Sequence, residues 1–344
     1  MKHARIKSCV VMLAAVAIWA TCVIATAQDT ANVDEFGVPL GDTPPPAPPG
    51  FKSQDEAMVA AMSGQIKVFM PGSPVPIPTG VVETKDIEYG KVGDRALLLD
   101  LYAPEKIEKP VPGLIFIHGG GWKSGSRTDY KYYTVRYAKR GYVVATISYR
   151  FSGEAPFPAC VQDAKCAVRW MRANAAKYNV NPDKIAVIGG SAGGYLSMMV
   201  GYSSDVPELE GAGGYPGVSS RVQAVVDLYG PGDLFSEGAR NVDVVKNFIG
   251  KPYDQAPKLY EQASPITYVT KDDPPTLIFQ GTVDDTVPVA QSDKVAAKLK
   301  EVGVPCEYEK FEGWPHTMDI VIDVNVRCQW FMNKFFDRYL KDKK

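Results

Sequence analysis

The feature that most constrains the fold of this chain is a strand-to-helix junction near the middle of the sequence. The apolar residues 185–188 predict a buried strand, and the small residues Ala192–Tyr202 predict a helix directly after it. Between them stands a GxSxG motif centred on Ser191. A chain that reverses so sharply holds the serine in a strained backbone conformation and lifts its hydroxyl above the sheet edge. Flanking glycines avoid collisions where strand and helix approach. We therefore interpret the motif as a nucleophile elbow; the alternative is a glycine-rich turn whose serine has no chemical role.

Length and composition agree with one large α/β domain with additions. The chain has 344 residues, 45% of them hydrophobic, and a formal net charge of -1. These values allow a sizeable core, and the lack of a basic cluster between aromatic residues argues against nucleic acid as a partner. The sequence contains three histidines and no His/Cys cluster with metal-ligand spacing, so it predicts neither a metal nor another cofactor. Nothing in the sequence indicates an oligomeric state.

Residues 1–27 have the three parts of a signal peptide. A basic start is followed by an apolar run through Ile24 and by the small residues 25–27. The run is shorter than a typical membrane span, and a retained N-terminal anchor is the alternative interpretation. We expect a secreted or periplasmic protein that is not stably inserted in a membrane after cleavage.

Residues 28–80 form a proline-rich N-terminal segment. Prolines dominate residues 44–49 and recur in residues 71–78, and such runs are stiff, extended and poor at packing. The sequence therefore predicts a tether before the main domain at residues 81–344. Within the segment, Ser53 is placed to cap a short helix over residues 54–62. That helix is either a lid or docking helix near the active site or a loosely ordered part of the tether.

Four cysteines follow the predicted signal peptide. Cys160 and Cys166 fall six residues apart on one predicted helix, about 9 Å along its axis, so they cannot pair with each other. Cys328 lies on an apolar helical stripe, which suits a buried free thiol. Because export permits disulfides, the sequence predicts at most one bridge, involving Cys306 or Cys328.

The main domain alternates strands and helices. Two strands around a turn at residues 90–94 predict a hairpin, and six more strands are predicted at residues 114–117, 143–148, 185–188, 224–228, 276–279 and 307–311. Helices are predicted between them, including one long helix from Val161 to Tyr178. This alternation predicts an α/β protein with a mostly parallel eight-stranded sheet covered by helices on both faces. Functional residues are expected at the carboxyl ends of the strands, and residues 231–271 are long enough for a small cap beside them.

A glycine-rich stretch, HGGGW from His118 onward, follows the strand at residues 114–117. Backbone N–H groups stabilise the negative oxygen of a tetrahedral intermediate, and glycine lets the backbone approach that oxygen closely. We predict that Gly119 and Gly120 are donors of an oxyanion hole, with Ala192 as the partner donor after the elbow. His118 is interpreted as a residue that fixes the loop. A plain connection between strand and helix is the alternative.

A candidate base and a candidate acid complete the pattern. A serine hydroxyl is a poor nucleophile until a base takes its proton, and His316 is the histidine placed to do so after the last strand. The base in turn needs an acid that holds its tautomer. Asp284, after the strand at residues 276–279, is the preferred acid; Asp233, after the preceding strand, is a rival, and Asp285 is interpreted as a surface carboxylate.

Taken in order, these motifs resemble one known family. HGGGW, the GGSAGG elbow, YGP at residues 229–231 and GTxDxxVPxxQS after Gln280 are similar to α/β-hydrolase esterases of the hormone-sensitive-lipase group, over residues 81–340. Within that group the chain most resembles bacterial acetyl esterases and bifunctional feruloyl/acetylxylan esterases. The chain departs from relatives at Gln280, where they often have histidine, and in its proline-rich segment. The resemblance implies an α/β-hydrolase fold, a nucleophile, acid and base at Ser191, Asp284 and His316, and oxyanion donors at Gly119, Gly120 and Ala192.

Three functions are compatible with these residues. The first is a secreted serine carboxylesterase for short acyl or feruloyl esters, on plant polysaccharide or on small molecules. The second is a serine peptidase or amidase, kept open by a resemblance to arylformamidases and prolyl peptidases but disfavoured by SAGG at the elbow. The third is a non-catalytic binding protein, disfavoured because no residue of the predicted triad is missing. Four aromatic residues are candidates for substrate contacts, with burial in the core as the alternative: Trp122, Tyr149, Tyr195 and Trp314.

Overall fold

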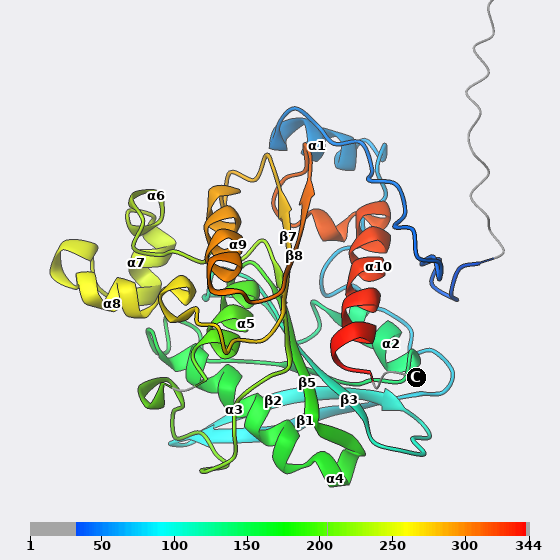
Figure 1. The fold of residues 1–344 in the computed structure, drawn as a ribbon, viewed down its shortest axis with the longest axis horizontal. Coiled ribbons are helices and arrows are strands. Elements are labelled where there is room, and N and C mark those ends of the chain that lie inside the picture. The colour runs from blue at the N-terminus through cyan, green and yellow to red at the C-terminus, as the bar shows by residue number, and fades with distance from the viewer. Residues whose placement is uncertain (1–31, 205, 342–344) are drawn as a thin grey trace, which may run out of the picture.

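The computed structural model describes residues 32–204 and 206–341, and the predicted signal peptide lies outside them. The main domain is built around one eight-stranded sheet with the order β1-β2-β4-β3-β5-β6-β7-β8 (Figure 1). β1 and β2 form the predicted hairpin, β2 pairs antiparallel with β4, and the remaining neighbours are parallel. The expected mostly parallel sheet is therefore confirmed. The strands are β1 Val81–Val92, β2 Arg95–Pro104, β3 Val111–Ile117, β4 Val143–Ile147, β5 Val180–Gly190, β6 Ala224–Leu228, β7 Thr276–Gly281 and β8 Cys306–Phe311.

Helices cover both faces of this sheet, as Figure 1 shows. Along β3, Ile115 and Ile117 pack into one core and Leu114 and Phe116 into the other, because successive side chains of a strand point to opposite faces. The first core is shared with α3 Ala159–Ala173, α5 Ala192–Tyr202 and α9 Ala290–Val302. The second core is shared with α2 Lys131–Lys139 and α10 Ile322–Tyr339.

The long helix expected at residues 161–178 is interrupted. α3 ends before Asn174, and a separate turn, α4 Ala175–Tyr178, follows it. The Asn174 side chain donates a hydrogen bond to the Trp170 carbonyl oxygen at 2.9 Å. Asparagine commonly competes with helical hydrogen bonding in this way, and the apolar periodicity alone did not reveal the interruption.

Residues 231–271 form short helices that project beside α9 in Figure 1. Val245, Phe248 and Ile249 of α7 point into the first core, so this cap is anchored to the domain and is not a free loop. Its elements are α6 Glu237–Arg240, α7 Asp243–Ile249, α8 Pro257–Gln262 and the 3-10 turns η2 Tyr253–Gln255 and η3 Pro265–Tyr268. Two further 3-10 turns lie elsewhere: η1 Pro207–Leu209 and η4 Met318–Ile320.

The proline-rich segment packs against the domain from residue 32 onward, so the expectation of a poorly packing tether is wrong for that part of it. The Trp330 and Trp314 indole N–H groups donate to the carbonyl oxygens of Gly41 and Pro48, each at 3.1 Å. An extended proline-rich chain leaves its carbonyl groups without internal partners, which makes them available to side chains of the domain. Further on, Val68 forms an antiparallel bridge with Val321.

The helix predicted inside this segment is present as α1 Gln54–Met62, and Ser53 is its N-cap. The Ser53 side chain accepts a hydrogen bond from the Glu56 backbone N–H at 3.3 Å. A cavity lined by Ala57, Met58 and His316 separates α1 from the loop after β8. α1 therefore lies beside the candidate site, which favours the docking alternative over a loose linker.

All four described cysteines are free thiols, so the one bridge that the sequence allowed does not form among them. Cys328 packs in the second core, whereas Cys160, Cys166 and Cys306 pack on the other side of the sheet. The sheet itself separates Cys328 from the other three.

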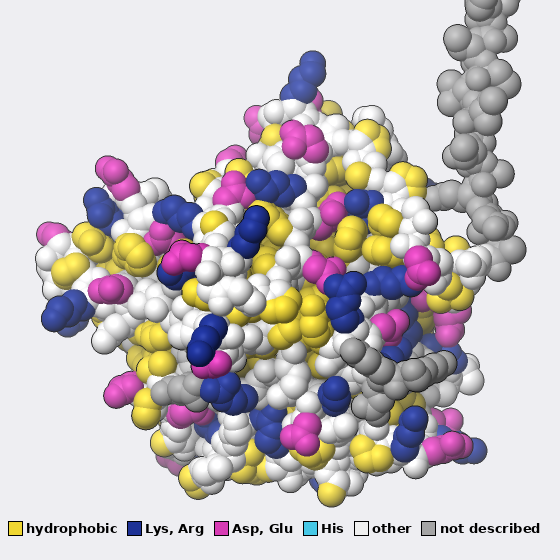
Figure 2. Space-filling model, in the orientation of Figure 1, with side chains coloured by type: hydrophobic (Ala, Val, Ile, Leu, Met, Phe, Trp, Pro, Cys, Tyr) yellow, Lys and Arg dark blue, Asp and Glu magenta, His cyan; other side chains and the backbone are white. Residues whose placement is uncertain are grey.

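Charges are interspersed on the face of the molecule seen in Figure 2, with Lys/Arg and Asp/Glu side chains side by side. Within the described ranges, no helix has the length and apolar character that crossing a membrane requires.

Candidate active site

Ser191 occupies the turn between β5 and α5 with the strained backbone that the motif predicts. Its φ is 56° and its ψ is -122°, a region that residues with a side chain rarely adopt. The turn is tight enough that a Cβ atom on Gly193 would lie 1.9 Å from the Ile117 carbonyl oxygen. One on Gly189 would lie 2.4 Å from the Gly193 backbone. Only glycine fits at these two positions, so the elbow geometry is fixed by its sequence.

The structure brings the three predicted triad residues together from the turns and loops that follow β5, β7 and β8. His316 Nε2 lies 3.0 Å from Ser191 Oγ, and His316 Nδ1 lies 2.6 Å from Asp284 Oδ2. Both distances are within hydrogen-bonding range. This chain of contacts has the arrangement needed to move a proton from the serine to the imidazole while the carboxylate holds the ring.

Asp284 is fixed by several donors. Its Oδ1 accepts hydrogen bonds from the backbone N–H groups of Thr286 and Val287 at 2.9 and 2.8 Å. Its Oδ2 accepts one from Gln280 Nε2 at 3.1 Å, and the Gln280 Oε1 is held by the Ser292 hydroxyl at 2.9 Å. Gln280, the departure from the resembled family, therefore orients the carboxylate that contacts His316.

The rival acid Asp233 lies in a different environment. Its Oδ2 is 2.6 Å from Lys294 Nζ, and its Oδ1 accepts a hydrogen bond from the Ser236 N–H. Asp285 is exposed, as expected. The structure thus places Asp284, and neither Asp233 nor Asp285, against His316.

The glycine loop after β3 packs against the elbow. A Cβ on Gly119 would lie 2.8 Å from the Gly190 carbonyl oxygen, and Gly120 has a φ of +106°, so both positions require glycine. Ala192 begins α5, where the first backbone N–H groups of a helix have no partner within it. Gly119, Gly120 and Ala192 all line cavities that open at Ser191, which is the placement expected of oxyanion donors.

His118 has the structural environment predicted for it. Its ring stacks on Tyr149 with centroids 4.4 Å apart, and its Nδ1 lies 2.8 Å from the Gly119 carbonyl oxygen. Burial lowers the pKa of His118 below its ordinary value.

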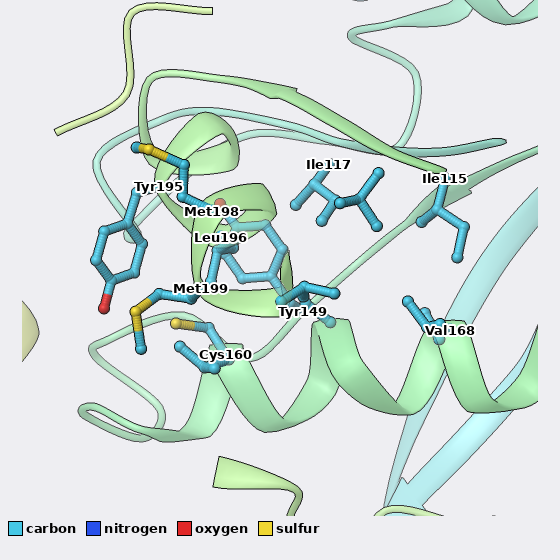
Figure 3. Close-up of a cluster of buried hydrophobic side chains, with 14 of the residues drawn as sticks. Ile115, Ile117, Tyr149, Cys160, Val168, Tyr195, Leu196, Met198 and Met199 are labelled. Atoms are coloured by element: carbon cyan, nitrogen blue, oxygen red, sulfur yellow. The ribbon is translucent and has the colours of Figure 1, made fainter. Parts of the chain in front are cut away.

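Two of the four aromatic candidates for substrate contacts belong to the core. Figure 3 shows Tyr149 and Tyr195 within a cluster of buried hydrophobic side chains, and their residues are 1% and 0% exposed. Neither lines a cavity that contains Ser191, so this assignment is corrected. Both residues are close in sequence to the glycine loop or the elbow, but their side chains point into the core. Trp314 is also buried and lines the cavity beside α1, whereas Trp122 does line a cavity that reaches Ser191.

Two cavities meet at Ser191. The first, about 440 Å³, is here called the His316 cavity, and its lining includes Ser191, His316, Gly119, Gly120, Phe69, Pro71, Asp129, Tyr133, Tyr229 and Asp319. The second, about 500 Å³, is here called the cap cavity, and its lining includes Ser191, Ala192, Trp122, Leu234, Val242, Val244, Val245 and Val287. The serine hydroxyl therefore stands between a compartment with polar groups and one lined largely by apolar side chains of the cap.

Sequence reasoning missed two parts of the His316 cavity. Asp319 follows His316 by three residues, a proximity that could have been noticed, but its tyrosine partners come from α2 and from the end of β6. Phe69 and Pro71 come from the segment interpreted as a tether. No local pattern in the sequence connects these residues.

Comparisons with known proteins agree with this fold. Residues 99–299 match the model of the BD-FAE family. Esterase LipC of Mycobacterium tuberculosis is 34% identical over 248 residues, which are 70% of this chain and 61% of LipC. A truncated carbohydrate esterase from gut microbiota is 30% identical with a TM-score of 0.66, covering 75% of this chain and 95% of that one. Est2 from Thermogutta terrifontis, a thermophilic esterase, is 28% identical with a TM-score of 0.65, covering 81% and 97%.

The fold and these similarities define a protein of the α/β-hydrolase class that is similar to esterases. Within this class, the chain belongs to the BD-FAE family. The chain spans less than two thirds of the length of the first curated relatives that it matches.

Proposed function

We propose that the protein is a carboxylic ester hydrolase (EC 3.1.1.-) in which Ser191, His316 and Asp284 act through an acyl-enzyme. The observation that carries this proposal is the continuous contact from Ser191 Oγ through His316 to Asp284, with distances of 3.0 and 2.6 Å. The names of the relatives support ester hydrolysis as the reaction.

Each residue has a defined step in this mechanism. His316 takes the proton of Ser191 as the serine oxygen attacks the ester carbonyl, and Asp284 stabilises the imidazolium that forms. Backbone N–H groups of Gly119, Gly120 and Ala192 stabilise the oxyanion. His316 then gives the proton to the leaving alcohol, and a water molecule, activated in the same way, releases the acid.

The substrates proposed are short acyl or feruloyl esters, with plant polysaccharide as one source of the alcohol. The cap cavity supports an acyl group of limited size, because apolar side chains such as Leu234, Val244 and Val287 line it. A carbohydrate esterase among the similar structures supports a sugar as the alcohol. We further propose that the protein is secreted or periplasmic, on the evidence of the signal-peptide pattern in residues 1–27.

The test is hydrolysis of p-nitrophenyl acetate by the protein and its Ser191→Ala variant. Removal of the nucleophile is expected to lower kcat by about 10⁴-fold or more. Ser204→Ala is the matched control, since the Ser204 hydroxyl donates to carbonyl oxygens of Val200 and Gly201 in α5; it should retain activity. Unchanged turnover in Ser191→Ala would refute the mechanism, and a parallel assay with p-nitroacetanilide would expose an amidase.

A further inference from the structure

The position of His316 assigns the two cavities at Ser191 to the two halves of an ester, if the proposed mechanism holds. The leaving alcohol takes its proton from the general acid, so its oxygen must lie within hydrogen-bonding reach of His316 Nε2. His316 lines the His316 cavity and does not line the cap cavity. The alcohol half therefore occupies the His316 cavity, and the acyl half occupies the cap cavity.

A carboxylate forms the polar wall of the His316 cavity. Asp319 lies in the 3-10 turn η4, just before α10, and is 2% exposed. Its Oδ2 accepts a hydrogen bond from the Tyr133 hydroxyl at 3.0 Å, and its Oδ1 accepts one from the Tyr229 hydroxyl. The Tyr229 ring also contacts the His316 ring, with centroids 4.7 Å apart. This group is thus adjacent to the reacting atoms.

The directions of the hydrogen bonds to Asp319 leave oxygen atoms that can accept further hydrogen bonds from a ligand. A tyrosine hydroxyl has one proton, and both Tyr133 and Tyr229 direct theirs to Asp319. The atoms that remain for a ligand are oxygen lone pairs of the two hydroxyls and of the carboxylate. The carboxylate and these two hydroxyls therefore complement a ligand that carries O–H or N–H donors.

The Asp, Glu, Lys and Arg side chains among the described residues that line the cavity are all acidic. Asp129 is a second carboxylate in its lining, and its Oδ2 accepts from the Ser126 backbone N–H at 2.9 Å. Of the described residues that line the cavity, none is Lys or Arg. A bound anion would lack a cationic partner there and would be repelled by Asp129 and by the ionised form of Asp319, whose pKa burial raises above its ordinary value.

Other residues of the cavity lining are apolar. Phe69 and Pro71 of the N-terminal segment and Ile320 of η4 contribute to the lining. A ligand that carries both hydroxyl groups and C–H groups can contact both kinds of residue.

We propose that the His316 cavity is a hydroxyl-binding subsite for the alcohol half of the ester, with Asp319 as the residue that determines its specificity. The alcohols it takes are uncharged and carry free hydroxyl groups beside the ester, as polyols and sugars do. Alcohols with an anionic group are excluded. This proposal deepens the proposed esterase function and rests on it.

The experiment compares two acetates that differ only in hydroxyl groups: 1-O-acetylglycerol and n-propyl acetate. Because the acyl half is the same, contributions from the oxyanion hole, the cap cavity and the release of acetate cancel in the ratio of kcat/KM. Hydrogen bonds to charged groups contribute enough to change such a ratio about tenfold to a hundredfold. We expect the protein to favour the glycerol ester by at least about tenfold, and Asp319→Asn to remove most of that preference.

A control variant and a second substrate keep the outcome interpretable. Asp233→Asn also replaces a buried aspartate, one that is paired with Lys294 outside the His316 cavity, and it should leave the ratio unchanged.

Should Asp319→Asn fail to fold, the anionic ester 3-acetoxypropanoate tests the charge argument with the unmodified protein. The kcat/KM for this ester is expected to be at least about tenfold below that for n-propyl acetate. A ratio that is equal in the protein and Asp319→Asn, or an anionic ester hydrolysed as fast as propyl acetate, would overturn the subsite. Absence of hydrolysis for both acetates would instead contradict the proposed function.

Discussion

The described aspartates show how the chemistry of one residue type depends on its partners. Asp284 has backbone and Gln280 donors and contacts His316. Asp233 is paired with Lys294. Asp227, at the end of β6, is fully buried and accepts one hydrogen bond, from the Gly230 N–H. The same carboxylate is therefore a group that holds a histidine ring, half of an ion pair, or a core group that resists ionisation.

The first prediction concerns the choice between Asp284 and Asp233. Asp284→Asn is expected to lower kcat for p-nitrophenyl acetate by about 10⁴-fold, because an amide favours the wrong tautomer of the histidine. Asp233→Asn should retain activity and lose about 1 kcal/mol or less of unfolding free energy, since its lysine partner is half-exposed. Steady-state kinetics on both variants is the measurement. Loss of activity in Asp233→Asn with activity retained in Asp284→Asn would reverse the assignment.

The second prediction concerns the pH dependence of stability at Asp227. Burial raises the pKa of Asp227 well above its ordinary value, and its Oδ2 has no hydrogen-bond partner within the described part of the chain. The folded state therefore binds this proton more tightly than the unfolded state. The resulting stability is fully present below the unfolded pKa near 4 and is lost as the pH rises through the folded pKa, at up to about 1.4 kcal/mol per pH unit.

Asp227→Asn removes this titration and keeps an acceptor for Gly230. Urea unfolding at pH 5 and pH 7.5 should show the protein losing more unfolding free energy over this interval than Asp227→Asn does. Equal losses in the two proteins would mean that Asp227 is not the buried proton-binding group described.

At the scale of elements, the elbow shows how a few glycines fix the position of a side chain. α5 packs against β3 closely enough that the Ile117 carbonyl oxygen lies at the place of an added Gly193 Cβ. The Ser191 N–H donates to the Leu228 carbonyl oxygen at 2.8 Å, which joins the turn to β6. Strand, turn and helix, together with the neighbouring strands β3 and β6, thus hold Ser191 at the edge of the sheet.

The third prediction tests this close approach. Gly193→Ala is expected to cost about 3 kcal/mol or more of unfolding free energy, because the contact is with backbone and neither strand nor helix can move without disturbing the sheet. Gly153→Ala is the matched control: the position is exposed, and an added Cβ there meets nothing within 4 Å. Its effect should stay within about 0.5 kcal/mol. Similar urea midpoints for the two variants would contradict the packing argument.

At the scale of the whole molecule, the N-terminal segment contacts the end of α2 and the C-terminal part of the domain. Asp34 pairs with Arg140 near α2, Pro48 accepts from Trp314, and Val68 bridges to Val321. Phe51 packs edge-on against Trp314 with ring centroids 5.3 Å apart. Trp314 precedes His316 by two residues, so the segment supports the loop that carries the proposed base.

The fourth prediction measures this support. Phe51→Ala should lower the unfolding free energy by about 1 to 3 kcal/mol, through lost apolar burial and a lost aromatic contact. Met62→Ala, at an α1 position that is 83% exposed, should change it by less than about 0.5 kcal/mol. Thermal or urea unfolding of both variants is the measurement. If Phe51→Ala is as stable as Met62→Ala, the segment is not a structural part of the domain.

The sequence predicted those features that depend on residues close together in the chain. The elbow, the glycine loop after β3, the cap of α1 by Ser53 and the eight strands follow from glycine sterics, side-chain hydrogen bonds and apolar periodicity, all of which act over a few residues. The same signals placed Asp284 and His316 after the strands that carry them. They did not place Tyr149 and Tyr195, because apolar patterns do not separate the lining of a pocket from the core.

Only the tertiary structure decided which distant groups meet. The Trp314 indole and the Pro48 carbonyl are 266 positions apart, and Tyr133 and Asp319 are 186 apart. Contacts of this kind depend on how helices, strands and an extended segment pack in three dimensions, and no periodicity or local motif encodes them. Local sequence therefore determined the turn on which Ser191 stands, whereas long-range packing determined which residues line the cavities around it and, with them, the groups available to recognise a substrate.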